Sequence, residues 1–145
     1  MNLTELIENL NYAKTVGDLD REIKQIELNS ATIGDQGLFV AIKGLKADGH
    51  KYIDSAITSG AVAIVCEEIP TEQNATIAYV QVTNSREALA ILAKRFYQGD
   101  DDRLVKIAVT GTNGKTSTVY FLRQLFTILG HKCGIIGTIE YDNGK

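Results

Sequence analysis

The stretch that most constrains this chain is an apolar run, a glycine-rich turn and a helical pattern that follow one another directly. The apolar run covers residues 104–109, and helical periodicity begins at Thr116. The turn between them ends in Gly114, Lys115 and Thr116. A strand, a glycine loop and a helix in this order form an anion site from backbone N–H groups at the helix N-terminus. The pattern therefore predicts that the chain binds a nucleoside triphosphate.

The loop is a shorter variant of the common phosphate-loop pattern. That pattern, G-x-x-x-x-G-K-[ST], would place its first glycine at position 109, where this chain has Val109. Gly111 and Gly114 allow the backbone to approach phosphates closely. Lys115 can place its ammonium group on the β- and γ-phosphate oxygens, and Thr116 can offer its hydroxyl to Mg²⁺. Kinases, hydrolases and ligases all use such loops, so the loop alone leaves the reaction open.

Composition excludes several classes of protein. The 145 residues carry a formal net charge of −3, which argues against a general nucleic-acid binder. No apolar run approaches the roughly 20 residues of a membrane-spanning helix, and the first residues show no secretory signal. Cys66 and Cys133 lie far apart inside apolar runs, which predicts buried thiols in strands rather than a disulfide or a metal site. We therefore expect a cytoplasmic protein without nucleic-acid or membrane partners.

Alternating strand and helix patterns predict an α/β fold with two domains. Expected strands cover residues 23–28, 38–42, 61–66, 77–82, 104–109 and 133–136, and expected helices cover residues 3–13, 52–59, 85–98 and 116–129, with Asn2 and Asn84 as caps of the first and third. The acidic run after Gly99 predicts a linker, which separates a domain of residues 1–101 from one of residues 102–145. The second domain has too few elements to cover its apolar surface, so we expect a fragment of a longer protein.

Two signatures of this chain resemble the Mur ligase family. Residues 110–116 resemble the family's ATP loop, and residues 134–139 are similar to the segment that follows it in the central domain. A second likeness, to the N-terminal domain of MurE-type members, covers five upstream segments: residues 28–31, 37–44, 47–53, 56–57 and 60–61. The two signatures stand in the family's order and separation, and together they cover nearly the whole chain.

The resemblance implies a small N-terminal α/β domain that binds a UDP-sugar, followed by the start of a phosphate-loop, parallel-sheet ATPase domain. It also implies a reaction that uses ATP and Mg²⁺. The terminal carboxylate of UDP-N-acetylmuramoyl-L-alanyl-D-glutamate would be phosphorylated, and the amine of lysine or meso-diaminopimelate would attack the acyl phosphate. The family's substrate threonines, magnesium-binding glutamate, modified lysine and amino-acid pocket would all fall after Lys145. The chain alone is therefore expected to be inactive.

The resemblance also implies roles for individual residues. Lys115 and Thr116 would be catalytic, with Thr116 as the magnesium ligand. ATP would be held by Gly111, Thr112, Asn113, Gly114, Lys115, Thr116 and Ser117, and the uridine part of the substrate would be contacted by Leu28, Ser30, Leu45, Lys46 and Ala47.

Other roles for these substrate residues stay open. Ser30 can instead satisfy its own turn, and Lys46 can be an ordinary solvated lysine. The family's usual Asp-Ser-Arg is here Asn29, Ser30 and Ala31, which loses both charges and puts the substrate contact in doubt.

Three other functions remain open. The chain can belong to a Mur-type amide ligase with a different acidic substrate, or be a nucleotide-binding module without chemistry. A small-molecule kinase is disfavoured, because such kinases usually begin close to their phosphate loop. His50 and His131 are expected to be solvated loop residues, and Asp48 is expected to hydrogen-bond its own turn.

Overall fold

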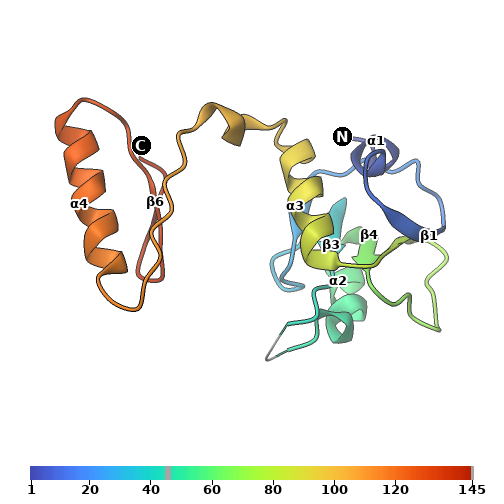
Figure 1. Ribbon diagram of the computed structural model, residues 1–145. Coiled ribbons are helices and arrows are strands. Elements are labelled where there is room, and N and C mark those ends of the chain that lie inside the picture. Colours follow the sequence, from blue (N-terminus) through green and yellow to red (C-terminus); the bar gives the residue numbers. More distant parts are fainter. Residues whose placement is uncertain (45–46, 145) are drawn as a thin grey trace. The chain divides into compact units, whose positions relative to one another are not determined.

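The computed structural model describes residues 1–44 and 47–144. The chain divides into two compact units, Met1–Arg103 and Leu104–Lys145. Figure 1 shows both units, and each is described here by itself.

The first unit is built on a five-stranded sheet. Its strands are β1 (Tyr12–Val16), β2 (Gln25–Glu27), β3 (Gly37–Val40), β4 (Ala61–Cys66) and β5 (Ala78–Val82), in the spatial order β1-β5-β4-β3-β2. Strands β2 to β5 are parallel to one another, whereas β1 runs antiparallel to β5 at the edge. The α/β class predicted from the sequence is confirmed. Because parallel strands share a direction, β2, β3 and β4 end at one edge of the sheet.

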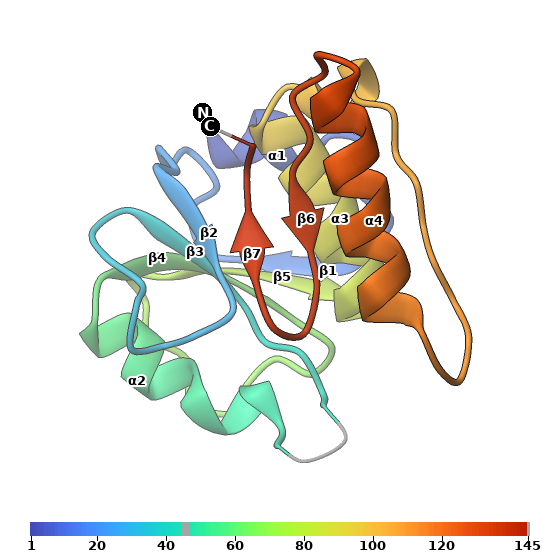
Figure 2. The same ribbon diagram turned by 90° about the vertical axis from the view of Figure 1, so that its left-hand side faces the viewer.

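Helices cover both faces of this sheet (Figures 1 and 2). Helices α1 (Leu3–Ile7) and α3 (Ser85–Phe96) pack on one face, where Leu6 and Leu92 lie in one apolar cluster with the strands. Helix α2 (Ile53–Thr58) packs on the other face through Ile53 and Ala56. Two 3₁₀ helices, η1 (Gly49–Tyr52) and η2 (Asp100–Arg103), complete the unit.

Both predicted helix caps are confirmed. The side-chain oxygen of Asn2 accepts a hydrogen bond from the backbone N–H of Thr4 at 2.9 Å. That of Asn84 accepts from the N–H groups of Arg86 at 3.1 Å and Glu87 at 3.2 Å. These oxygens satisfy N–H groups that have no partner inside the helix, which fixes where α1 and α3 begin.

The second unit contains one helix and one small hairpin. Helix α4 (Lys115–Ile128) is followed by β6 (Ile135–Ile136) and β7 (Tyr141–Asp142), which pair antiparallel. Within the unit the Tyr120 hydroxyl donates to Glu140 Oε2 at 2.6 Å, and Arg123 forms an ion pair with Asp142. These polar contacts tie the helix to the hairpin.

One predicted strand of the second unit is wrong. Residues 104–109 form no strand, and Val105 is 90% exposed. A strand requires a neighbour to accept its hydrogen bonds, and within the described residues no strand pairs with this run. The predicted strand at 133–136 is shortened to Ile135–Ile136 and pairs antiparallel rather than parallel. Helix α4 has the predicted amphipathic pattern, yet its described side chains include no buried residue.

The cysteines differ from one another. Cys66 is buried at the end of β4, as predicted, whereas Cys133 lies outside any strand and is half-buried. Among the described residues, no group of three or more His, Cys, Asp or Glu side chains is arranged to hold a metal ion. The helices of residues 1–44 and 47–144 lack the combination of length and apolar character that crossing a membrane requires.

Candidate nucleotide-binding sites

The first candidate site is the glycine loop that precedes α4. Gly114 is the N-cap residue of this helix and adopts the left-handed conformation, with φ of 74°. Gly111 also has a positive φ, of 152°. A side chain with a Cβ rarely adopts these angles, so the two glycines allow the chain to wrap tightly around the start of the helix. The loop therefore lies at the N-terminus of α4, which carries the partial positive charge of the helix.

Lys115 folds back over this loop. Its Nζ donates hydrogen bonds to the carbonyl oxygens of Gly111 at 2.6 Å and Thr112 at 3.3 Å. In the described part of the chain, no acceptor receives a hydrogen bond from the backbone N–H groups of residues 111–117. Free N–H groups at a helix N-terminus are a kind of site that binds phosphate oxygens, and the Lys115 ammonium group on the same loop adds positive charge.

Thr116 differs from the other threonines of α4. The hydroxyls of Thr118 and Thr127 donate to the carbonyl oxygens of Gly114 at 2.9 Å and Arg123 at 2.8 Å. Thr116 is exposed, and its hydroxyl has no hydrogen-bond partner among the described residues. A hydroxyl in the first turn of the helix that is not tied to the backbone fits the role of a magnesium ligand.

The second candidate site is the edge where β2 and β3 end. Leu28, one residue after β2, is 50% exposed, and Ser30 is 9% exposed. Ala47 lies in the loop after β3, whereas Leu45 and Lys46 lie outside the described residues. Since β2 and β3 pair directly, the segments that follow them are neighbours at this edge. The carboxyl edge of a parallel sheet is where α/β proteins usually bind ligands.

Asn29 holds the turn that carries Ser30. Its side-chain oxygen accepts from the N–H of Ala31 at 3.0 Å, and its carbonyl oxygen accepts from the N–H of Thr32 at 3.1 Å. No partner of the Ser30 hydroxyl is seen among the described residues. The turn-stabilising hydrogen bonds that the sequence left open to Ser30 are therefore made by Asn29.

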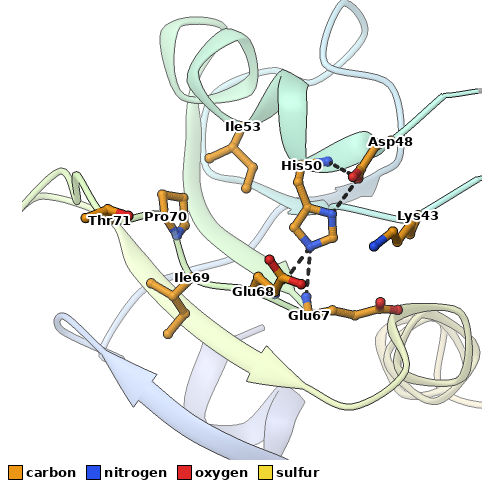
Figure 3. Close-up of a pocket in the computed structure, with 9 residues that line it drawn as sticks. All are labelled: Lys43, Asp48, His50, Ile53, Glu67, Glu68, Ile69, Pro70 and Thr71. Carbon is orange, nitrogen blue, oxygen red and sulfur yellow. Dashed lines mark hydrogen bonds and ion pairs between the residues drawn. The ribbon is translucent and has the colours of Figure 1, made fainter.

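A cavity of about 280 Å³ opens beside this edge, where β3 and β4 end (Figure 3). It is lined by Lys43, Asp48, His50, Ile53, Glu67, Glu68, Ile69, Pro70 and Thr71. No motif in the sequence indicates this cavity, because its walls come from two separate segments, residues 43–53 and 67–71.

His50 is the central side chain of this cavity. Its Nδ1 lies 2.7 Å from Asp48 Oδ1, and its Nε2 accepts hydrogen bonds from the backbone N–H groups of Glu67 at 3.0 Å and Glu68 at 3.4 Å. The expectation of a solvated histidine is therefore wrong for His50, because its ring joins two segments of the fold. Asp48 also accepts a hydrogen bond from the backbone N–H of His50 at 3.0 Å, which confirms the predicted bond within its own turn.

Two carboxylates beside the cavity are held in their charged form. Hydrogen bonds from the backbone N–H and the side chain of His50 lower the pKa of Asp48 from its ordinary value. Hydrogen bonds from the backbone N–H and the hydroxyl of Ser85 lower the pKa of Glu67. Glu67 also accepts, at its carbonyl oxygen, a hydrogen bond from Gln81 at 3.0 Å. Nothing in the local sequence around Glu67 signals this role.

Fold and loop together define a phosphate-loop α/β protein. Residues 22–97 match the Mur ligase family, catalytic domain, and residues 109–144 match the Mur ligase middle domain. These two matches cover most of the sequence, so the chain belongs to the Mur ligase family.

Its relatives include named ligases and solved structures. Over its whole length the chain is 40% identical to the UDP-N-acetylmuramoyl-L-alanyl-D-glutamate--2,6-diaminopimelate ligase of Parabacteroides distasonis, of which it spans 30%. It is 38% identical to the ligase of the same name from Cytophaga hutchinsonii, covering 97% of this chain and 29% of the relative. The solved MurF ligase of Thermotoga maritima, in complex with ADP, is 32% identical with a TM-score of 0.56, over 72% of this chain and 23% of MurF. The chain thus spans less than a third of these proteins.

Proposed function

We propose that this chain is the sugar-nucleotide-binding domain and the first part of the ATP-binding domain of an ADP-forming amide ligase. Residues 1–101 would form the first domain and residues 102–145 the second. The observation that carries this proposal is the 40% identity to a diaminopimelate ligase over the whole chain, which includes both candidate sites. The open glycine loop and the accessible edge of the sheet support it.

The proposed reaction joins an amino acid to UDP-N-acetylmuramoyl-L-alanyl-D-glutamate during peptidoglycan synthesis. The terminal carboxylate of this substrate takes a phosphoryl group from ATP, and an amine then displaces phosphate from the acyl phosphate. The names of the relatives favour 2,6-diaminopimelate over lysine as the amine. The location proposed for this chemistry is the cytoplasm.

The phosphate loop would hold ATP in this reaction. The N–H groups of Gly111, Thr112, Asn113, Gly114, Lys115, Thr116 and Ser117 would face the phosphate oxygens. The Lys115 ammonium group would leave the carbonyl oxygen of Gly111, where it lies at 2.6 Å, and pair with those oxygens. Thr116 would hold Mg²⁺, which supplies positive charge that stabilises the phosphoryl group during transfer.

The edge of the sheet would hold the nucleotide end of the substrate. Leu28 offers an exposed apolar side chain, and Ser30 offers a hydroxyl that its own turn does not use. We propose that Ala47, with Leu45 and Lys46 beside it in the sequence, completes the contact from the loop after β3. Because the chain spans less than a third of the ligases that it matches, it is expected to bind substrate by itself without forming an amide.

A calorimetric titration of the chain with UDP-N-acetylmuramoyl-L-alanyl-D-glutamate tests the proposal. We expect binding by the unmodified chain and weaker binding by Ser30→Ala, because the substitution removes a ligand hydrogen bond. Ser55→Ala is the matched control, since Ser55 is an exposed residue of α2. Equal binding by both variants would contradict the role of Ser30, and no binding by the unmodified chain would overturn the substrate assignment.

A second candidate is an amide ligase of the same family with a different acidic substrate. Asn29 and Ala31 replace the usual Asp and Arg, so two charges that accompany the substrate contact are absent. The absence of UDP-sugar binding in the same titration, together with retained ATP binding, would favour this candidate.

A further inference from the structure

The ring of His50 connects the end of one strand to the loop that follows its neighbour. Its two nitrogen atoms contact different segments: Nδ1 faces Asp48, and Nε2 faces the backbone of Glu67 and Glu68 just after β4 (Figure 3). Its side chain is only 18% exposed. The ring therefore forms a fixed link between two parts of the carboxyl edge.

The hydrogen-bond partners of the ring indicate its tautomer. A backbone N–H can only donate, so Nε2 must be the unprotonated nitrogen that accepts from Glu67 at 3.0 Å. The proton of the neutral ring then lies on Nδ1 and is donated to Asp48 Oδ1 at 2.7 Å. Each ring nitrogen thus has one function, and neither is left to solvent.

Asp48 closes the base of the loop that follows β3. Lys43 and Asp48 form an isolated antiparallel bridge, and the N–H of Gly44 donates to the carbonyl oxygen of Ala47 at 2.9 Å. The N–H of Gly49 donates to the carbonyl oxygen of Ile42 at 2.9 Å. The base of this loop is therefore ordered by its own backbone and fixed to the sheet through Asp48 and His50.

Glu67 connects His50 to helix α3. Glu67 donates its N–H to the His50 ring, and its carboxylate accepts from the N–H of Ser85 at 3.0 Å. Ser85 is the first residue of α3 and is fully buried. The loop after β3 is thereby connected, through one ring and one carboxylate, to a rigid part of the core.

We propose that His50 is a positioning residue, which holds Ala47 and Asp48, in the described part of the loop after β3, where they can receive the nucleotide end of the substrate. This inference rests on the proposed function, in which this loop contacts the uridine. The ring acts through the loop and does not itself touch the ligand. Its Nε2 hydrogen bonds to Glu67 and Glu68 are the essential part, because they connect the loop after β3 to the segment that follows a different strand, β4.

Two substitutions test the contributions of the two ring nitrogen atoms separately. In His50→Gln, the side-chain amide reaches the position of Nε2 and offers an oxygen that can accept from the N–H of Glu67. In His50→Asn, the shorter amide reaches only the position of Nδ1, so it can donate to Asp48 but cannot reach the N–H of Glu67. We expect the glutamine variant to bind UDP-N-acetylmuramoyl-L-alanyl-D-glutamate like the unmodified chain. The asparagine variant should bind about tenfold more weakly, the scale of one or two lost hydrogen bonds.

Amide hydrogen exchange supplies a measurement that does not depend on the ligand. The N–H of Glu67 should exchange faster in His50→Asn than in His50→Gln, while the N–H groups inside β4 remain protected in both. Circular dichroism confirms that each variant is folded. This comparison distinguishes a local loss of the link from general destabilisation.

The outcomes decide between the two proposals. Binding by the unmodified chain together with unchanged binding by His50→Asn would overturn the inference and leave the proposed function intact. Equal weakening in both variants would also overturn it, because the Nε2 acceptor would then have no special value. If the unmodified chain does not bind the sugar nucleotide, the proposed function fails, and the role of His50 in substrate binding fails with it.

Discussion

The carboxylate of Glu67 accepts two hydrogen bonds from Ser85, from its backbone N–H at 3.0 Å and its hydroxyl at 2.9 Å. Glu67 follows β4, and Ser85 is the first residue of α3. The pair therefore fixes the start of the helix at the carboxyl edge of the sheet. A negative charge is also favourable at this position, because the N-terminus of a helix carries partial positive charge.

Replacing Glu67 with glutamine should destabilise the first unit. Glu67→Gln removes the charge from both hydrogen bonds, and charge-assisted bonds are stronger than neutral ones. We expect the free energy of unfolding in urea at pH 7 to fall by about 1–2 kcal/mol. Glu68→Gln is the matched control, because Glu68 is exposed and adjacent. Equal midpoints for Glu67→Gln and the unmodified chain would show that the carboxylate contributes nothing.

The advantage of Glu67 over glutamine should disappear in acid. Hydrogen bonds from Ser85 lower the pKa of Glu67 in the folded state, so the unfolded chain takes up its proton first as pH falls. The stabilisation is complete above the pKa of an unfolded glutamate, about 4.3, and is lost as pH falls through the folded value. Urea unfolding of both proteins between pH 7 and pH 3 measures the difference. A difference that stays constant over this range would contradict the assignment.

The parts of the fold that the sequence predicted are those with a local cause. Strand β4 has the predicted bounds because an unbroken apolar run is preceded by Gly60. Strand β1 was missed and lies partly in the predicted helix of residues 3–13. Three of its residues, Tyr12, Ala13 and Lys14, are exposed. Its partner strand, β5, lies far along the sequence. An edge strand with exposed side chains has no strong local pattern.

The candidate sites also contain features with a local cause in the sequence and features that depend on distant segments. The left-handed Gly114 and the position of Lys115 at the start of α4 follow from the local pattern of glycine, lysine and threonine. The contact between His50 and Glu67 joins residues 17 positions apart. It depends on which strands are neighbours, and no spacing in the sequence contains that information. The strand predicted at residues 104–109 was wrong for a related reason, since apolar character alone does not supply a pairing partner.

Gly60→Ala should destabilise the first unit strongly. Gly60 ends α2 with a φ of 116°, and a Cβ there would lie 2.8 Å from the backbone carbon of Gly34. Both the backbone angle and the contact oppose a side chain, so we expect a loss of about 2–3 kcal/mol in the free energy of unfolding. Gly34→Ala is the control, because its Cβ would come no closer than 3.6 Å to the Gln25 side chain. A Gly60→Ala midpoint equal to that of the control would refute this explanation.

The two thiols should react at very different rates. Cys66 is buried in β4, and burial raises its pKa to about 12, which leaves almost no thiolate at neutral pH. Cys133 is half-buried in the second unit. With Ellman's reagent at pH 8 we expect one thiol to react in the folded chain and two in denaturant. Cys133→Ser should abolish the native reaction, whereas rapid modification of Cys66 in that variant would contradict its burial.

Removing the Lys115 ammonium group should weaken ATP binding. We expect the unmodified chain to bind ATP weakly, because it spans less than a third of the ligases that it matches. Lys115→Ala removes a cation that lies 2.6 Å from the carbonyl oxygen of Gly111 in the loop. Loss of one charge-assisted contact to phosphate should weaken binding by about tenfold or more. An NMR titration that follows the amide signals of Gly111 and Gly114 measures this change.

The matched control for this titration is Lys132→Ala, which removes an exposed lysine from the same unit. It lowers the net charge equally, so a purely electrostatic attraction of ATP to the unit would weaken both variants to the same degree. A specific phosphate site weakens Lys115→Ala alone, because the Lys115 ammonium group contacts the loop at Gly111 and Thr112. A dissociation constant in the low micromolar range for the unmodified chain would contradict the expectation that further residues are needed to complete the pocket.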